Sequence, residues 1–200
     1  MEPVKKVVGT AVPLERSNVD TDQIIPAVWL KRIERTGFGA GLFSAWMEDP
    51  DFVLNRPEYK RASILLAGSN FGCGSSREHA VWALEESGFY AVISDSFADI
   101  FRANALKNGL LAVQVEPEQA KAIEEAVKQD PTTLITIDVA ERTVAVDSAG
   151  ITAPFPLDDF AQYRLMNGLD DISLTLQRAG EISEFEKSRP KWSPAVPDPA

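Results

Sequence analysis

Residues 62–88 read ASILLAGSNFGCGSSREHAVWALEESG. The first six residues form a short apolar run, which is typical of a buried β-strand. Glycines at positions 68, 72 and 74 follow, and an amphipathic stretch over residues 76–87 then ends at Gly88, a residue that commonly terminates helices. We therefore predict a strand, a glycine-rich loop and a helix in succession, which is the repeating unit of an α/β fold.

The same alternation continues along the chain. We predict strands at residues 91–94 and 110–115, helices at 97–108 and 118–128, a β-hairpin over 133–139 and 143–146, and a mainly helical segment over 158–178 that breaks near Gly168. Upstream, residues 4–12 indicate a strand, residues 18–26 a turn-rich loop and residues 31–57 an irregular stretch. The fold class expected from pattern alone is α/β.

Composition indicates a globular protein. Apolar residues make up 44% of the chain and charged residues 25%, which is ordinary for a folded domain. We expect one domain over residues 1–188 and a disordered tail over 189–200, where four prolines oppose regular structure. No apolar run approaches the roughly 20 residues of a membrane span, and the N-terminus lacks the apolar core of a signal peptide. The sequence thus predicts a cytoplasmic protein with no membrane partner.

Charge and cysteine content exclude two kinds of site. The chain has 30 acidic and 20 basic residues, so its net charge of −10 repels a phosphate backbone, and we expect no nucleic-acid partner. The single cysteine, Cys73, cannot form an intrachain disulfide. It also cannot by itself hold an iron–sulfur cluster, which takes three or four thiolates, so we expect no cofactor on this chain.

The glycine-rich loop carries the candidate chemistry. Ser75 and Glu78 have the spacing of a capping box, which predicts a helix start that presents the positive end of its dipole. Arg77 adds a guanidinium whose shape matches a carboxylate, so the predicted ligand is a small anion. In the alternative interpretation, the glycines only make a turn, the serines only cap the helix and Arg77 only pairs with a surface acid.

Three motifs in order carry a resemblance to a known family. They are GSNFGCGSSREHA at residues 68–80, NVDTDQIIP at 18–26 and SFADIFRANALKNGLL at 96–111. Together they resemble the swivelling domain of the aconitase superfamily, and the 200-residue length resembles the stand-alone small subunits of bacterial isopropylmalate isomerases. The resemblance implies a three-layer β/β/α architecture.

The resemblance also implies a hydro-lyase activity. Such an enzyme dehydrates and rehydrates a small dicarboxylic hydroxy acid, here interconverting 2-isopropylmalate and 3-isopropylmalate in leucine biosynthesis. By this resemblance, Ser75 is the base that takes a proton from the substrate carbon beside a carboxylate. The implied substrate-binding residues are Ser76, Arg77, Asp22, Leu30, which would contact the isopropyl group, and Arg32, which would contact a second carboxylate. A separate large subunit would carry a [4Fe–4S] cluster.

Several alternatives remain open at this stage. A methylmalate or homoaconitate hydro-lyase would share the same motifs, and a stand-alone anion-binding regulatory module could use the same helix start. Thiol catalysis is disfavoured, since the lone His79 is the sole histidine partner for Cys73 and is expected to pack on its helix. We interpret residues 97–108 as a core helix in which Asn104 and Lys107 are structural.

Overall fold

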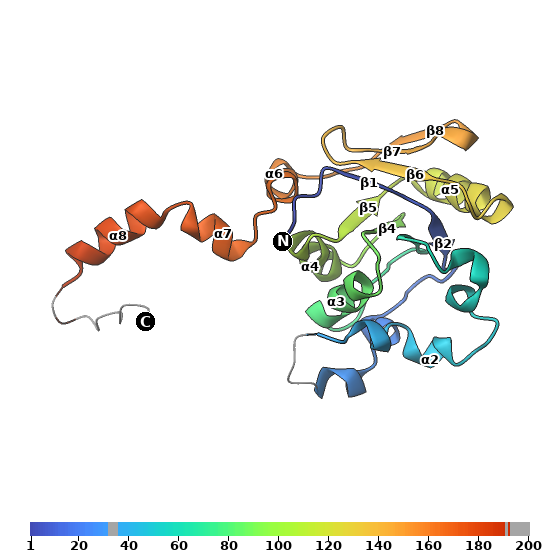
Figure 1. Ribbon diagram of the computed structural model, residues 1–200, viewed down its shortest axis with the longest axis horizontal. Coiled ribbons are helices and arrows are strands. Elements are labelled where there is room, and N and C mark those ends of the chain that lie inside the picture. The colour runs from blue at the N-terminus through green and yellow to red at the C-terminus, as the bar shows by residue number, and fades with distance from the viewer. Residues whose placement is uncertain (32–35, 191, 193–200) are drawn as a thin grey trace.

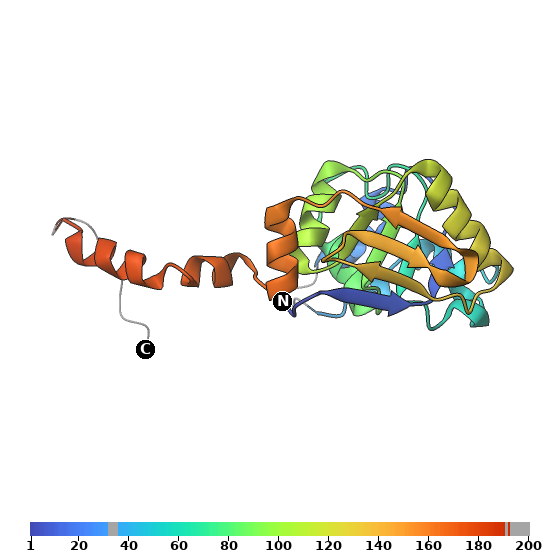
Figure 2. The same ribbon diagram turned by 90° about the horizontal axis from the view of Figure 1, so that it is seen from above.

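The computed structural model describes residues 1–31, 36–190 and 192. Two four-stranded sheets form the body of the molecule, with helices around them (Figures 1 and 2). The strands are β1 (Lys6–Gly9), β2 (Ala11–Pro13), β3 (Ile64–Leu66), β4 (Ala91–Ser94), β5 (Leu111–Gln114), β6 (Ile135–Asp138), β7 (Thr143–Val146) and β8 (Ile151–Pro154). The helices are α1 (Thr21–Ile24), α2 (Ser44–Met47), α3 (Glu78–Glu86), α4 (Asp99–Asn108), α5 (Pro117–Gln129), α6 (Asp159–Asn167), α7 (Asp171–Leu176) and α8 (Ala179–Ser188), and 3₁₀ turns include η1 (Ala27–Lys31).

The central layer is a parallel sheet in the order β2-β3-β4-β5. Its strands are continuous apolar runs, and every residue of β2, β3 and β4 is buried, because a parallel sheet in this position is covered on both faces. Helices α3 and α4 pack on one side, and the antiparallel sheet lies on the other (Figure 1). This arrangement agrees with the predicted α/β class and the β/β/α order.

The outer layer is an antiparallel sheet in the order β1-β6-β7-β8. Buried and partly exposed residues alternate along β6 and β7, as expected for a sheet with one face on the core and one toward solvent. The predicted hairpin is confirmed as β6 and β7. The third strand, β8, was not predicted; it is short, ends in proline and lies at the sheet edge, where proline is tolerated.

The β structure predicted at residues 4–12 is confirmed, but it consists of two strands, because the chain changes sheets there. Strand β1 joins the antiparallel sheet and β2 the parallel one, with only Thr10 between them. At this crossing a Cβ on Gly9 would lie 1.9 Å from the Ser63 hydroxyl oxygen, so a larger residue would require the Ser63 side chain to rotate away.

Most of the other predicted strands and helices are confirmed, but one helix was missed. The strands expected at 62–67, 91–94 and 110–115 are confirmed as β3, β4 and β5, and the helices at 97–108 and 118–128 as α4 and α5. The turn-rich loop at 18–26 contains a helix that we missed, α1. Asp20 starts it, because its carboxylate accepts from the Gln23 N–H at 2.7 Å while the Gln23 side chain accepts from the Asp20 N–H at 2.9 Å.

The C-terminal part leaves the body as an arm. Helix α6 ends at Gly168, as predicted, and α7 and α8 then extend away from the sheets (Figures 1 and 2). Helix α8 was not predicted as a separate element. The expected disordered tail, 189–200, falls largely on residues 191 and 193–200, which lie outside the described part of the chain, so it stays a prediction, as does one domain over 1–188. Across the described ranges, the helices lack the combined length and apolarity needed to cross a bilayer.

Candidate active site

Two of the three sequence motifs meet beyond the ends of β2 and β3. The Gly72 N–H donates to the Val19 carbonyl at 2.8 Å, and the Thr21 N–H donates to the Cys73 carbonyl at 2.9 Å. These bonds continue the parallel pairing of the two strands into their loops. The site therefore forms at the carboxyl edge of the parallel sheet, where open α/β sheets commonly bind ligands.

The third motif joins on the other side of the glycine-rich loop. The Phe71 N–H donates to the Ser96 carbonyl at 3.1 Å, and the Ala98 N–H donates to the Phe71 carbonyl at 3.0 Å. The Phe71 ring is fully buried and meets the Phe97 and Phe101 rings edge-on, with centroids 6.5 and 5.2 Å apart. This aromatic cluster fixes the loop to the start of α4.

Gly72 is required where the loop passes over this cluster. Its φ is +77°, and a Cβ on it would lie 2.2 Å from Cγ of Phe101. Both the backbone conformation and the lack of space exclude a larger residue. The glycine thus lets the loop lie directly on α4.

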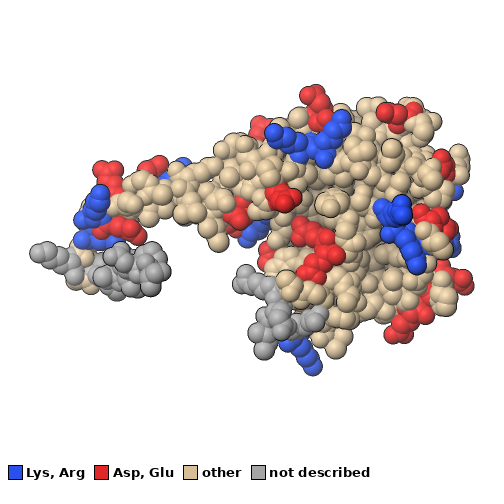
Figure 3. Space-filling model, in the orientation of Figure 1, with Lys and Arg blue, Asp and Glu red and all other residues tan. Residues whose placement is uncertain are grey.

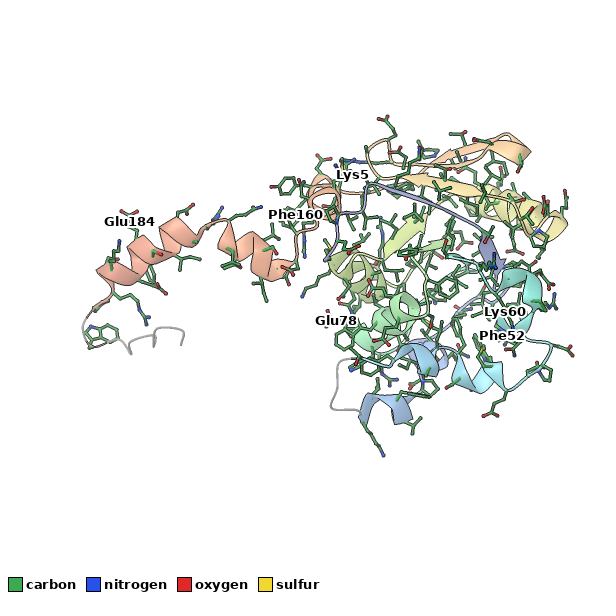
Figure 4. The ribbon with its side chains drawn as sticks, viewed as in Figure 1. Lys5, Phe52, Lys60, Glu78, Phe160 and Glu184 are labelled. Carbon is green, nitrogen blue, oxygen red and sulfur yellow. The ribbon has the colours of Figure 1, made fainter. Side chains whose placement is uncertain are left out.

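The predicted capping box at Ser75 and Glu78 is wrong. Helix α3 begins at Glu78, and its N-cap is Arg77, which has extended backbone angles and makes no side-chain cap. The Glu78 carboxylate instead accepts from the Asn108 side chain of α4 at 3.3 Å; Figure 4 labels Glu78 at the start of α3. As a result Ser75 lies three residues ahead of the helix and is exposed, as is Ser76.

Arg77 and Asp22 form a two-pronged ion pair. Both terminal nitrogens of the guanidinium donate to the carboxylate, Nη2 to Oδ2 at 3.0 Å and Nη1 to Oδ1. The Arg77 side chain is 17% exposed and lines the pocket described below, whereas the Asp22 side chain is 56% exposed and lies outside that lining. The structure thereby brings together two residues that the sequence analysis had assigned to the site separately.

Thr21 is a residue of the site that the sequence analysis missed. It is buried, and its hydroxyl donates to the Ser75 carbonyl at 2.9 Å. Thr21 therefore ties the loop that carries Ser75 to α1. Its position between the two acids of the DTD motif was the available signal.

These residues surround an open pocket of about 260 Å³. It is lined by Thr21, Gly72, Gly74, Ser75, Ser76, Arg77, Ala98, Asp99, Ile100 and Phe101. The lining includes Arg77, the N-cap residue of α3, and residues 98–101, the N-cap and first turn of α4. The first N–H groups of a helix have no carbonyl partner within the helix. Ile100, which we expected in the core, is 53% exposed and supplies an apolar wall.

Three predicted site residues are not part of this lining. Asp22 contacts the pocket only through its ion pair with Arg77. Leu30 lies on η1, where it is half-buried against the core, and it does not occur among the described residues that line the pocket. Arg32 lies outside the described residues.

His79 and Cys73, the remaining candidate residues, pack within the fold. His79 packs edge-on against Phe38 and Trp82, with ring centroids 5.1 and 4.8 Å away, as its interpretation as a packed helix residue requires. Cys73 is half-buried within the loop. Over the part of the chain that the structure describes, histidine, cysteine and acidic side chains do not gather in a group of three or more that could hold a metal ion.

Comparisons with known proteins identify the family of this chain. Residues 1–118 match the family described as Aconitase C-terminal domain, and residues 171–198 match the family described as the C-terminal domain of the 3-isopropylmalate dehydratase small subunit. Proteins named 3-isopropylmalate dehydratase small subunit are 57% identical over 98% of this chain in Rubrobacter xylanophilus and 62% identical over 94% in Frankia casuarinae, covering 100% and 95% of those relatives.

A solved structure is also similar. The crystal structure of 3-isopropylmalate dehydratase from Methanocaldococcus jannaschii superposes with a TM-score of 0.65 at 25% sequence identity, covering 90% of this chain and 99% of that chain. The match over most of both chains supports the layered architecture described above. The chain therefore belongs to the family of 3-isopropylmalate dehydratase small subunits, whose main domain is that of the aconitase C-terminus.

Proposed function

We propose that this chain supplies the serine and arginine part of the active site of an isopropylmalate isomerase, a hydro-lyase of leucine biosynthesis that acts in the cytoplasm. One observation supports this most strongly: Ser75, Ser76 and Arg77 line one open pocket together with two helix N-termini. Such a pocket suits a small dicarboxylate. The family membership favours this function over a stand-alone anion-binding module.

Ser75 acts as the base in this proposal. Removing a proton from the carbon beside a carboxylate builds negative charge on that carboxylate, which preorganised donors must stabilise. The exposed Ser75 Oγ takes the proton as an alkoxide, while Ser76 and Arg77 hold the substrate carboxylate oxygens. The helix N-termini and the guanidinium stabilise both negative charges, the alkoxide and the carboxylate.

Asp22 keeps Arg77 in place until substrate arrives. The carboxylate of Asp22 occupies the guanidinium fork from the solvent side, where a substrate carboxylate would approach. A substrate carboxylate then displaces Asp22 or shares the guanidinium with it. Ile100 offers an apolar contact in the pocket lining, and Leu30 and Arg32 remain proposed contacts that would act on the far side of the substrate.

The [4Fe–4S] cluster implied by the family does not fit the described residues of this chain. A single half-buried cysteine falls short of the three or four thiolates that a cluster takes, and no other group of ligands is present in the described ranges. We assign the cluster to the large subunit. The chemistry of this chain is then binding, orientation and proton transfer.

Coexpression with candidate large subunits tests this function. The purified pair should interconvert 2-isopropylmalate and 3-isopropylmalate with a higher kcat/KM than methylmalate or homoaconitate, and neither chain alone should be active. A pair that prefers methylmalate or homoaconitate would overturn the substrate assignment. Tight binding of 2-isopropylmalate by this chain alone, with no large subunit required for its effect, would support the regulatory module instead.

A further inference from the structure

The C-terminal arm, defined here as residues 170–190, takes no part in the proposed chemistry. It projects from the body beside α6 (Figures 1 and 2). Every residue of α7 and α8 is described, and none is buried. Ile172, Leu176 and Phe185 are 72%, 63% and 68% exposed, and Ile182 is also exposed. These apolar side chains lie on a part of the molecule that its own core does not cover.

The arm needs a second surface to be stable. Helices α7 and α8 have six and ten residues, and isolated helices shorter than about 12–15 residues are marginal in water. Their apolar residues have helical spacing, Ile172 with Leu176 and Ile182 with Phe185. Arm residues from both helices also line one shared hollow. Helices of this kind gain their stability by packing an apolar face against another element.

The body holds only the root of the arm. The Asp171 carboxylate lies 2.7 Å from Nζ of Lys107 and 3.0 Å from Nη2 of Arg164. The Asp170 carboxylate accepts from the Ser173 N–H at 2.7 Å, which caps α7. The direction of the arm is therefore set at its root, while α8 stays free of the body (Figure 4, where Glu184 marks it).

The position of the arm next to the open pocket favours the large subunit as the partner that covers its apolar residues. Helix α4 carries Ile100 at the pocket and Lys107 at the arm root, seven residues apart, or about 10 Å along the helix. The root of the arm is therefore only about 10 Å along α4 from the open pocket, so a chain that covers the pocket can also reach the arm. In addition, residues 171–198 match a separate family that is named for the small subunit, while the shared aconitase domain matches residues 1–118.

Self-association through the arm is less well supported. A coiled coil needs apolar positions repeated over about three or four heptads, whereas the arm has two short helices interrupted near Gln177 and Arg178. Figure 3 shows a mostly uncharged stem and charged side chains gathered toward the far end. Helix α8 carries Glu181, Glu184 and Glu186 against one basic residue, Lys187, with Arg178 and Arg189 at its two ends, so its acids can meet basic residues of a partner.

We infer that the arm is the docking element for the large subunit. Its apolar residues lie in an apolar groove of that subunit, and the α8 acids meet basic residues at the rim. This inference rests on the proposed function, because that function requires the large subunit.

The test compares the affinity of two variants of the full chain for the large subunit. In Ile182→Ser/Phe185→Ser, both changes are at exposed positions, so the melting temperature of the isolated chain should match the wild type. Leu134→Ser, which removes a 57% exposed leucine from the body, is the matched control. We expect the double variant to raise the dissociation constant, measured by sedimentation, at least tenfold, with kcat unchanged at saturating large subunit and the control unaffected.

A dissociation constant within twofold of the wild type would overturn the inference. If the wild-type pair assembles through the arm but does not turn over isopropylmalate, the proposed function fails and the docking role stands. If the double variant assembles normally into an active enzyme, the docking role fails and the function stands. A dimer of the isolated wild-type chain that the double variant abolishes would assign the arm to a second copy and overturn the inference.

Discussion

In the proposed function, Arg77 binds a substrate carboxylate, and in the structure a carboxylate of its own chain holds it in place. Asp22 fills its fork from the solvent side. The Asp22 carboxylate is 56% exposed, so water screens it. In the proposed function, an incoming dicarboxylate can therefore compete with Asp22 for the guanidinium. Meanwhile the guanidinium keeps its orientation. The exchange explains how a fixed charge can be present without substrate and still be available to it.

The hydrogen bond from Thr21 to the Ser75 carbonyl is expected to hold Ser75 in position. Thr21→Val keeps the shape of the side chain but removes the hydroxyl that donates to the Ser75 carbonyl. We expect kcat of the reconstituted enzyme to fall about tenfold, with KM little changed, and the free energy of unfolding to fall by about 1 kcal/mol. Thr21→Ser, which keeps the hydroxyl, should recover most of kcat. Equal losses in both variants would point to packing rather than to the hydrogen bond.

Glu85 provides a prediction about pH. Burial, aided by the charge of Glu86, raises the pKa of the Glu85 carboxyl from 4.5 to about 7. Between these values the folded chain keeps a proton that the unfolded chain has lost. The contribution of Glu85 to the free energy of unfolding therefore falls as pH rises from 4.5 to about 7. Above that window the folded chain bears the full cost of ionising this part-buried carboxyl.

Glu85→Gln removes this cost, since glutamine resembles the protonated acid. Because the carboxyl is only part-buried and water screens it, we expect a gain of about 1–2 kcal/mol in the free energy of unfolding near pH 8 and almost none near pH 4. Denaturant unfolding of the isolated chain at both pH values measures it. The exposed Glu184→Gln is the control. A gain that is equal at the two pH values would contradict this account of Glu85.

At the scale of elements, the site forms because three loops leave neighbouring parallel strands at the same edge. The length of the apolar run and the glycines after it were enough to predict β3, the loop and α3 in order. The start of α3 was not predictable from local sequence, because the Glu78 side chain is used by Asn108 of α4 rather than by its own helix. The contact between Glu78 and Asn108 therefore replaces the capping box that the local sequence favoured.

The ion pair in the site was also beyond the reach of sequence patterns. Asp22 and Arg77 are 55 positions apart, and their contact depends on the register between the loops that extend β2 and β3. The sequence named both residues by resemblance but gave no reason for them to touch. The backbone bonds from Gly72 to Val19 and from Thr21 to Cys73 set that register.

Gly72→Ala tests how the loop is fixed to α4. Gly72 has a positive φ and a Phe101 ring in the way of any Cβ, whereas Gly88 has a positive φ and nothing within 4 Å. We expect Gly88→Ala to cost about 1 kcal/mol in the free energy of unfolding from backbone strain alone. Gly72→Ala should cost about 1–3 kcal/mol more from the clash. Equal costs would show that the aromatic cluster yields to the added methyl group.

At the scale of the whole molecule, this chain has an active-site half that opens outward. The net charge is −10, yet the pocket lining includes the Arg77 guanidinium, which is paired with Asp22, and the first residues of α4. Ser75 is exposed rather than enclosed by its own fold. Strong electrostatic stabilisation requires a site from which water is excluded, and an open pocket of this kind does not exclude water. The geometry is complete only when a second chain covers it.

The central claim is that Ser75 is the base, and turnover by the complex carrying Ser75→Ala tests it most directly. With the wild-type large subunit saturating, we expect kcat to fall roughly 10²–10⁴-fold. Subunit affinity, substrate dissociation constant and melting temperature should stay at wild-type values, because the hydroxyl is exposed and caps no helix. A Ser75→Ala complex that turns over within about threefold of the wild type would contradict the account.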